Sequence, residues 1–253
     1  MGCLPPISVG GMKNRCLIIC PVYNEADYLV NFHRDLRRHY GGKIVFIDDG
    51  STDGSRELIR SLDDTGILTI LHTIRRGYGS ALKTGFRFAL NGGWEKVVTI
   101  DADLQHPPRL VPEFFQRLEK REVILGSRYL EGDPTGDAPP ERRLINRYVS
   151  SLLEKVFDTK FTDPFCGLRA YRCSFLEKAI LNENSYGLGL EILLELIRTQ
   201  TEFEEVPLEA IYLDYRRTFL DGLQTPRERL WYYLKVIERK KREIDGEDTM
   251  PGG

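Results

Sequence analysis

The sequence predicts an α/β protein with a mostly parallel sheet flanked by helices, in a single domain that ends in a C-terminal helix. Short apolar runs alternate with longer amphipathic segments over the first two-thirds of the 253 residues. A strand–helix–strand order at this spacing requires right-handed crossovers, which produce parallel strands. Hydrophobic residues make up 41% of the chain and charged residues 29%, so it has the composition of a globular protein.

Each expected element follows from its local pattern. Short apolar runs predict buried strands at 17–20, 43–47, 67–71, 97–100 and 123–125. Apolar residues at helical spacing predict helices at 24–40, 51–62, 80–90 and 108–119. The second helix opens with a Ser-Thr-Asp-Gly cluster that is expected to cap it. After residue 126 the pattern changes, and we expect a helix, strand, helix, strand and helix at 142–157, 168–171, 188–198, 206–215 and 226–242.

The chain divides by composition into one folded unit and its ends. We expect a disordered leader at 1–14, an α/β domain at 15–225, an amphipathic helix at 226–245 and a disordered tail at 246–253. The loop at 131–141 is rich in turn residues and has little apolar content to anchor it. It is a candidate lid.

Charge, hydropathy and cysteine content argue against nucleic-acid-binding, membrane-spanning and zinc-binding proteins. The net charge of −2 gives no field that would recruit nucleic acid. No apolar run approaches the roughly 20 residues of a spanning helix, and no signal peptide is recognisable. The cysteine number is odd and no C-x-x-C or zinc-ligand spacing occurs. We therefore expect inert thiols in a reducing, cytoplasmic setting, and no zinc.

Polar clusters follow three of the expected strands, at 21–25, 48–53 and 101–106. Ligands of parallel sheets bind beyond the carboxyl ends of the strands, so these clusters are expected to meet at one edge. No G-x-G-x-x-G follows the first strand, which argues against a dinucleotide-dependent dehydrogenase.

The sharpest local feature is Asp101-Ala102-Asp103. In an extended segment these two carboxylates point the same way, and Gln105 continues the alternation. Oxygen ligands with open positions suit Mg²⁺ or Mn²⁺ held jointly with a diphosphate. The alternative is a helix cap or solvated turn. For the 48–53 cluster, a Gly-rich turn and a base- or ribose-binding site likewise stay open.

Taken together, these segments resemble glycosyltransferase family 2 enzymes of the GT-A fold, whose sheet is Rossmann-like. The nearest resemblance is to polyprenyl- or dolichyl-phosphate sugar transferases, and it runs from about residue 17 to 215. The segments that carry it are Cys20–Glu25, Asp48–Asp53, Arg76–Ala81, Asp101–His106, Gly126–Tyr129 and Asp163–Tyr171.

The resemblance implies a role for each matching residue. The nucleotide-binding set would be Pro21, Tyr23, Glu25, Asp49 and Ala102, with Asp49 bonded to the base. The metal would be held by Asp101, Asp103 and Gln105. The catalytic set would be Asp101, Asp103 and Arg128, with Arg128 facing phosphate oxygens. Arg142 or Arg143 would clamp the acceptor phosphate; the alternative for both is a solvated helix face.

The implied reaction is an inverting, metal-dependent transfer of a sugar from a GDP- or UDP-sugar to a polyprenyl or dolichyl phosphate. A phosphate acceptor is already an anion and needs no general base, whereas a hydroxyl acceptor needs one. Candidates for that base are Asp163, Glu191 and His106. Two alternatives stay open: the same donor with a saccharide or protein hydroxyl acceptor, and a non-catalytic sugar-nucleotide-binding protein.

The end of the chain departs from the pattern. Phosphomannose-type members carry a late Arg-x-x-Gly-x-Ser-Lys segment, and no Ser-Lys pair follows in 215–224, which leaves the donor sugar open. From 227 to 242 seven basic residues outnumber two acidic ones in an aromatic helix. Such a helix can lie on an anionic membrane surface, so peripheral membrane contact is one interpretation and packing on the domain is the other.

Overall fold

The structure is a computed structural model that describes residues 15–132, 138–209, 211 and 219–246. The expected leader, most of the expected tail and the centre of the candidate lid lie outside the described residues. So do residues 215–218 of the late segment in which no Ser-Lys pair was found.

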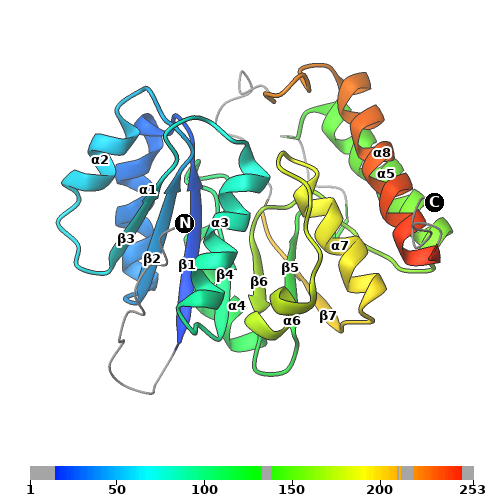
Figure 1. Ribbon diagram of the computed structural model, residues 1–253, viewed down its shortest axis with the longest axis horizontal. Coiled ribbons are helices and arrows are strands. Elements are labelled where there is room, and N and C mark those ends of the chain that lie inside the picture. The colour runs from blue at the N-terminus through cyan, green and yellow to red at the C-terminus, as the bar shows by residue number, and fades with distance from the viewer. Residues whose placement is uncertain (1–14, 133–137, 210, 212–218, 247–253) are drawn as a thin grey trace, which may run out of the picture.

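Seven strands of the described residues form one sheet, in the order β3-β2-β1-β4-β6-β5-β7 (Figure 1). They are β1 (Cys16–Val22), β2 (Lys43–Asp48), β3 (Ile67–Leu71), β4 (Lys96–Thr99), β5 (Val123–Ser127), β6 (Arg169–Arg172) and β7 (Phe203–Pro207). β3, β2, β1 and β4 are parallel neighbours, as are β5 and β7. β6 lies between β4 and β5 and is antiparallel to both. The prediction of a mostly parallel sheet is therefore confirmed, with one reversed strand.

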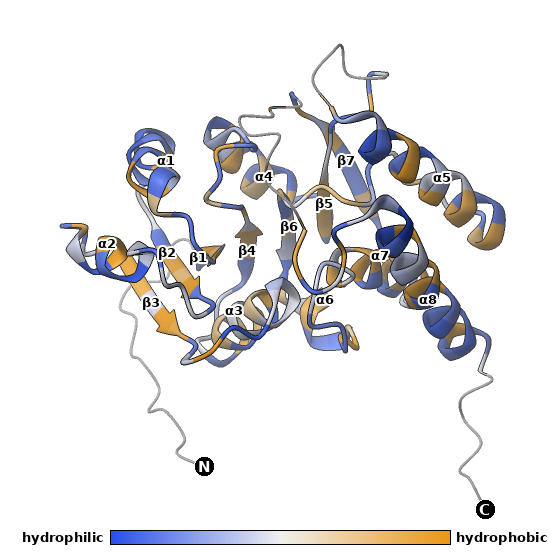
Figure 2. Cartoon of the chain, turned by 90° about the horizontal axis from the view of Figure 1, so that it is seen from above, coloured by the Kyte–Doolittle hydropathy of each residue, from blue (hydrophilic) through white to orange (hydrophobic). Residues whose placement is uncertain are grey.

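Helices cover both faces of the sheet (Figure 2). One face carries α1 (Ala26–His39), α2 (Ser55–Ser61), the 3₁₀ helix η1 (Pro108–Leu110) and α4 (Val111–Arg117). The other carries α3 (Tyr78–Asn91), α5 (Pro140–Phe157), α6 (Cys173–Lys178), α7 (Leu188–Arg198) and α8 (Pro226–Asp245). This arrangement buries the central strands on both sides, which explains their continuous apolar runs.

Alternate side chains of each central strand enter the two cores. In β1, Leu17 and Ile19 pack with the α3 side, whereas Ile18 and Cys20 pack with the α1 side. The two-residue period of a strand produces this division, so a one-residue slip would exchange the two faces. The register of β1 is consequently fixed by both cores.

Three elements differ from the expected ones. The helix expected at 108–119 divides into η1 and α4, and α6 was not predicted. The last strand runs over Phe203–Pro207, earlier than expected, because its backbone pairs with β5 from Val123 to Ser127. Pairing with a neighbour decides where a strand lies, and this information is absent from a local apolar pattern.

Helix α8 is attached to α7 by buried charges. Lys240 has no exposed surface, and its Nζ donates to Glu195 Oε1 at 2.9 Å and to the carbonyl oxygen of Ile180 at 2.8 Å. Arg239 donates to Glu183 at 2.7 Å and to Glu191 at 2.9 Å. Arg239 and Lys240 therefore bond to the rest of the protein. This agrees with the interpretation that the helix packs on the domain.

The Lys240→Met substitution tests this attachment. It removes one of the two cations that pair with the buried carboxylate of Glu195, the other being Arg198 at 2.6 Å, so we expect the free energy of unfolding to fall by about 1–3 kcal/mol. Urea denaturation followed by circular dichroism measures it. Lys241→Met is the matched control, because Lys241 is about half exposed and pairs with Asp245 at the surface. Equal stabilities of the two variants would contradict the proposed attachment.

Candidate active site

A pocket of about 520 Å³ opens at the edge of the sheet where β1, β2, β4 and β5 end. This volume lies in the ordinary range for ligand pockets, about 300–1,000 Å³. Most of the residues that the resemblance singled out line it: Pro21, Tyr23, Glu25, Asp49, Asp101, Asp103, Gln105, Arg128 and Arg142. The expected convergence of the three polar clusters is therefore present.

The turns after β1 and β2 are tied to each other. The backbone N–H of Asn24 donates to Ser51 Oγ at 3.1 Å, and the N–H of Thr52 donates to Asn24 Oδ1 at 2.9 Å. The N–H of Ala26 donates to Asp53 Oδ2 at 2.9 Å. The cluster expected to cap α2 thus mainly holds the turn after β1, and α2 itself has a glycine at its N-cap position. These bonds fix the wall that presents Tyr23 to the pocket.

Asp49 is buried and accepts three hydrogen bonds. Its Oδ1 lies 2.6 Å from His72 Nδ1 and accepts from the N–H of Arg76 at 2.9 Å. Its Oδ2 accepts from the N–H of Gly77 at 2.7 Å. These contacts give Asp49 a positioning role, because they hold the segment before α3 against β2. A direct hydrogen bond from Asp49 to a base stays a prediction.

The Asp101–His106 segment is a turn, and the extended geometry expected for it is wrong. Leu104 adopts a φ of 60°, which reverses the chain after Asp103. Both carboxylates still line the pocket, whereas Ala102 is 1% exposed and packs in the core beneath it. Ala102 is therefore absent from the pocket wall, contrary to its expected place in the nucleotide-binding set.

Negative charge accumulates at this turn. Tyr78 donates its hydroxyl to Asp101 Oδ1 at 3.0 Å, and burial together with that carboxylate raises the pKa of Tyr78. Burial opposes a charged His106, but a hydrogen bond with Cys166 and the charges of Asp101 and Asp103 raise the pKa of His106 to about 9. His106 Nδ1 lies 3.7 Å from Asp101 Oδ2. A cation placed here would be stabilised by both carboxylates.

The donor set fits a divalent ion that is shared with a substrate. Among the described residues no group of three or more His, Cys, Asp or Glu side chains forms a metal site. Asp101 and Asp103 would supply two oxygen ligands and Gln105 an amide oxygen, all from one turn. The remaining positions suit phosphate oxygens and water, as Mg²⁺ sites on phosphate substrates usually have.

Arg128 is held by a buried carboxylate. Its Nε donates to Asp163 Oδ2 at 2.7 Å and its Nη2 to Asp163 Oδ1 at 2.9 Å, a bidentate pair. Asp163 has no exposed side-chain surface, and neither it nor Glu191 lines the pocket. Both are therefore removed as candidate general bases. Of the three candidates only His106 reaches the pocket.

Of the two arginines of α5 that were expected to bind the acceptor phosphate, only one lines the pocket. Arg142 lines the pocket, and its guanidinium carbon lies 5.1 Å from the centroid of the Phe219 ring. Arg143 is not among the lining residues that the structure describes. The acceptor-phosphate interpretation accordingly stays with Arg142 alone.

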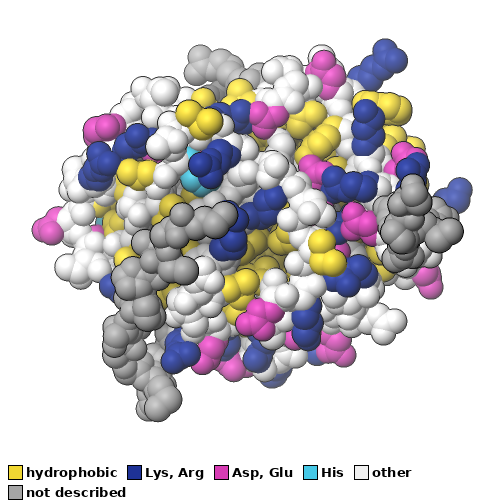
Figure 3. All heavy atoms as spheres, viewed as in Figure 1, with side chains coloured by type: hydrophobic (Ala, Val, Ile, Leu, Met, Phe, Trp, Pro, Cys, Tyr) yellow, Lys and Arg dark blue, Asp and Glu magenta, His cyan; other side chains and the backbone are white. Residues whose placement is uncertain are grey.

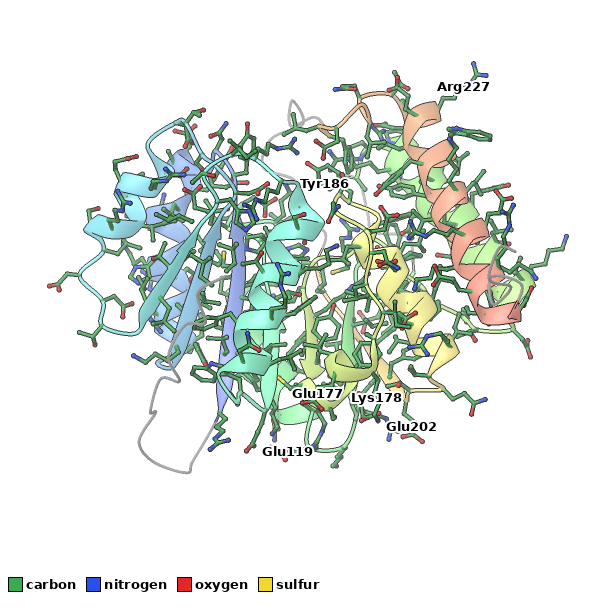
Figure 4. All side chains as sticks on the ribbon, in the orientation of Figure 1. Glu119, Glu177, Lys178, Tyr186, Glu202 and Arg227 are labelled. Atoms are coloured by element: carbon green, nitrogen blue, oxygen red, sulfur yellow. The ribbon has the colours of Figure 1, made fainter. Side chains whose placement is uncertain are left out.

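Sequence reasoning missed an aromatic and basic wall. Tyr186, labelled in Figure 4 near the start of α3, stacks on Tyr78 with centroids 5.7 Å apart. Arg75 lies over the Tyr23 ring at 4.9 Å and forms an ion pair with Asp221, a residue just after the undescribed segment. These residues come from loops that are distant in sequence. No local signal marked them except the turn-rich composition around residue 221.

Two residues of α8 also line the pocket, Arg229 and Tyr233. Both are at least 95% buried. The helix was interpreted from its net charge and aromatic content, which do not show that Arg229 and Tyr233 face the pocket.

A mostly parallel α/β sheet with an acidic turn after β4, and with arginines in the same pocket, has the architecture of GT-A-type glycosyltransferases. The chain belongs to glycosyl transferase family 2, whose sequence model matches residues 17–180. The resemblance inferred from the motifs is thereby confirmed, and the protein is a glycosyltransferase.

Several relatives have assigned activities. The chain is 33% identical over 194 residues to a dolichol-phosphate mannosyltransferase of Saccharomyces cerevisiae, a match that covers 71% of this chain and 70% of the relative. It is 27% identical over 215 residues to an undecaprenyl-phosphate mannosyltransferase of Micrococcus luteus, with 82% and 88% covered. It is 27% identical over 216 residues to a UDP-N-acetylglucosamine–dolichyl-phosphate N-acetylglucosaminyltransferase of Methanococcus voltae, with 78% and 86% covered.

Solved structures share the fold. Glucosyl-3-phosphoglycerate synthase from Mycobacterium tuberculosis in complex with uridine diphosphate superposes with a TM-score of 0.70 at 17% identity, covering 93% of this chain and 87% of that one. The same enzyme was also crystallised with Mn²⁺, uridine diphosphate and phosphoglyceric acid, and that structure gives a TM-score of 0.64. At this identity the likeness establishes the architecture.

The Asp49→Asn substitution tests the positioning role of Asp49. An amide offers one acceptor oxygen where three donors converge, so we expect the free energy of unfolding to fall by about 1–3 kcal/mol. Urea denaturation measures it. Asp63→Asn, at an exposed position, is the control and should change stability by less than about 0.5 kcal/mol. A neutral Asp49→Asn variant would show that the segment before α3 does not depend on this carboxylate.

Proposed function

We propose that this glycosyltransferase moves a sugar from a GDP- or UDP-sugar to a polyprenyl or dolichyl phosphate, with inversion and with Mg²⁺ or Mn²⁺. The observation that carries the proposal is that Asp101, Asp103, Arg128 and Arg142 all line one pocket. Three relatives named above act on dolichyl or undecaprenyl phosphate by name, which supports the acceptor class.

The chemistry follows from these charges. Sugar transfer leaves negative charge on the departing diphosphate, and a divalent ion held by Asp101 and Asp103 would supply Lewis-acid stabilisation of that charge. Arg128, kept in place by Asp163, would add a fixed positive charge that needs no reorganisation during the reaction. Arg142 would orient the acceptor phosphate, whose oxygen attacks the anomeric carbon.

The positions of the candidate general bases further support a phosphate acceptor. A hydroxyl acceptor requires a base near the reacting oxygen. Asp163 and Glu191 are fully buried and bonded to Arg128 and Arg239 respectively, outside the pocket lining. His106 lines the pocket, but its pKa of about 9 favours the protonated form, which is not a base. A phosphate acceptor makes no such demand. Membership of an enzyme family also favours catalysis over the non-catalytic alternative.

We also propose that the exposed ends of α5 and α8 contact a membrane surface. None of the described helices is both long and apolar enough to span a bilayer. Leu144 and Tyr148 of α5 and Trp231 of α8 are more than half exposed, each within two turns of a pocket-lining arginine on its own helix. Lys235 lies 5.0 Å from the Trp231 ring. Figure 3 shows hydrophobic side chains beside Lys and Arg at the upper end of α8.

Transfer to a short-chain polyprenyl phosphate tests the proposed function. Screened with GDP- and UDP-sugars, the protein is expected to form a sugar–phosphate-linked product that requires Mg²⁺ or Mn²⁺ and disappears with EDTA. Asp103→Ala should lower the rate by about 100-fold or more because a metal ligand is lost, while Asp63→Ala should not. The unphosphorylated polyprenol should accept no sugar. Transfer to the alcohol, or full activity of Asp103→Ala, would defeat the proposal.

Vesicle flotation tests the membrane contact. The protein is expected to float with vesicles that contain anionic lipid, and the triple variant Leu144→Glu, Tyr148→Glu and Trp231→Glu should float at least several-fold less. Point variants are preferable to removing α8, since its inner face is part of the core. Ile180→Glu, at an exposed position before α7, is the control. Unchanged flotation of the triple variant would refute the contact.

A further inference from the structure

Arg229 is a buried cation in the wall of the proposed acceptor site. It lies one turn into α8, its side chain is 6% exposed, and it lines the pocket beside Tyr233. A buried charge is costly unless a counter-charge and hydrogen bonds compensate it. The partners of Arg229 therefore indicate whether it serves the fold alone.

Within the described residues the partners of Arg229 satisfy only part of its guanidinium. Nη1 donates to the carbonyl oxygens of Leu223 at 3.3 Å and Gln224 at 3.0 Å, the segment that leads into α8. The nearest carboxylate, Glu141, is 4.0 Å from Nη2 and its side chain is 42% exposed. A guanidinium has five N–H donors. Two neutral carbonyls and one distant, hydrated carboxylate leave its charge weakly compensated.

The guanidinium of Arg142 lies near the same aromatic ring as that of Arg229. The guanidinium carbon of Arg229 lies 4.7 Å from the Phe219 ring centroid, and that of Arg142 lies 5.1 Å from the same centroid. Burial raises the pKa of Tyr233, and the charges of Arg229 and Arg142 both act against that rise. An anion that lies between these two guanidinium groups would meet both positive charges.

A row of aromatic contacts links Asp101 to Arg229. Tyr78, which donates to Asp101, stacks on Tyr186, and the centroids of the Tyr186 and Phe219 rings lie 5.0 Å apart with the rings steeply inclined. The guanidinium carbon of Arg229 lies 4.7 Å from the centroid of the Phe219 ring. Three rings therefore stand between a proposed metal ligand and Arg229 along this row, which favours the acceptor phosphate over the donor diphosphate as the anion at Arg229.

We propose that Arg229 binds the phosphate of the acceptor together with Arg142, so that α8 is part of the active site as well as of the core. The planar guanidinium matches a phosphate with parallel hydrogen bonds, which a lysine cannot reproduce. The proposal rests on the proposed function, since it assigns a residue to the acceptor of that reaction.

Calorimetric binding of a short-chain polyprenyl monophosphate to the full chain tests the assignment. Arg229→Met should weaken this binding by at least about tenfold, the loss expected for one charge-assisted hydrogen bond to a phosphate. Arg229→Lys keeps the positive charge but lacks the paired N–H donors of the guanidinium, and it should weaken the binding of the polyprenyl phosphate at least about threefold. Arg242→Met, at an exposed position on α8 that pairs with Glu238, should bind as the wild type does. The affinity for UDP or GDP with Mg²⁺ should change less than twofold in all variants.

The outcomes separate the two proposals. If the wild type binds the polyprenyl phosphate and both Arg229 variants bind it equally well, Arg229 has no acceptor role and the proposed function stands. An equal loss of nucleotide affinity would place Arg229 at the donor diphosphate and also overturn the assignment. A wild type that neither binds nor glycosylates the polyprenyl phosphate would refute both. Circular dichroism reports folding of each variant, and Arg229→Lys decides if Arg229→Met does not fold.

Discussion

The candidate site depends on the parallel pairing of β2, β1 and β4. Parallel strands direct their carboxyl ends to the same edge, so the three polar turns that follow them lie close together at that edge. Burial on both faces fixes the register, since a slip of one residue would exchange the two cores. Within this frame, bonds such as Asn24 to Ser51 and Asp49 to Gly77 fix the turns themselves.

The opposite wall is built differently. Arg128 comes from the end of β5, Arg142 from the first turn of α5, and Arg229 from α8, which is attached to α7 by Lys240 and Glu195. The C-terminal helix therefore closes the pocket on one side and exposes Trp231 on the other. The proposed lipid-linked acceptor would fit this combination, with its phosphate in the pocket and its hydrocarbon near the exposed aromatic side chain.

The sequence predicted what is local or periodic. Apolar runs located the central strands, and the order of strands and helices predicted the edge at which Asp101 and Asp103 lie. It did not predict the antiparallel β6, because strand direction depends on pairing. It did not predict the backbone reversal at Leu104, which no spacing rule contains, or that Ala102 packs in the core beneath the pocket. The inward position of Arg229 was likewise hidden, since net charge does not say which face of a helix is buried.

The most direct test of the account is a crystal structure of the protein with Mn²⁺ and the nucleoside diphosphate that it binds, UDP or GDP. The account predicts an anomalous difference peak for manganese beside the carboxylates of Asp101 and Asp103, with the nucleoside next to Tyr23. A manganese peak elsewhere, or a nucleotide bound away from the ends of β1 and β4, would contradict it.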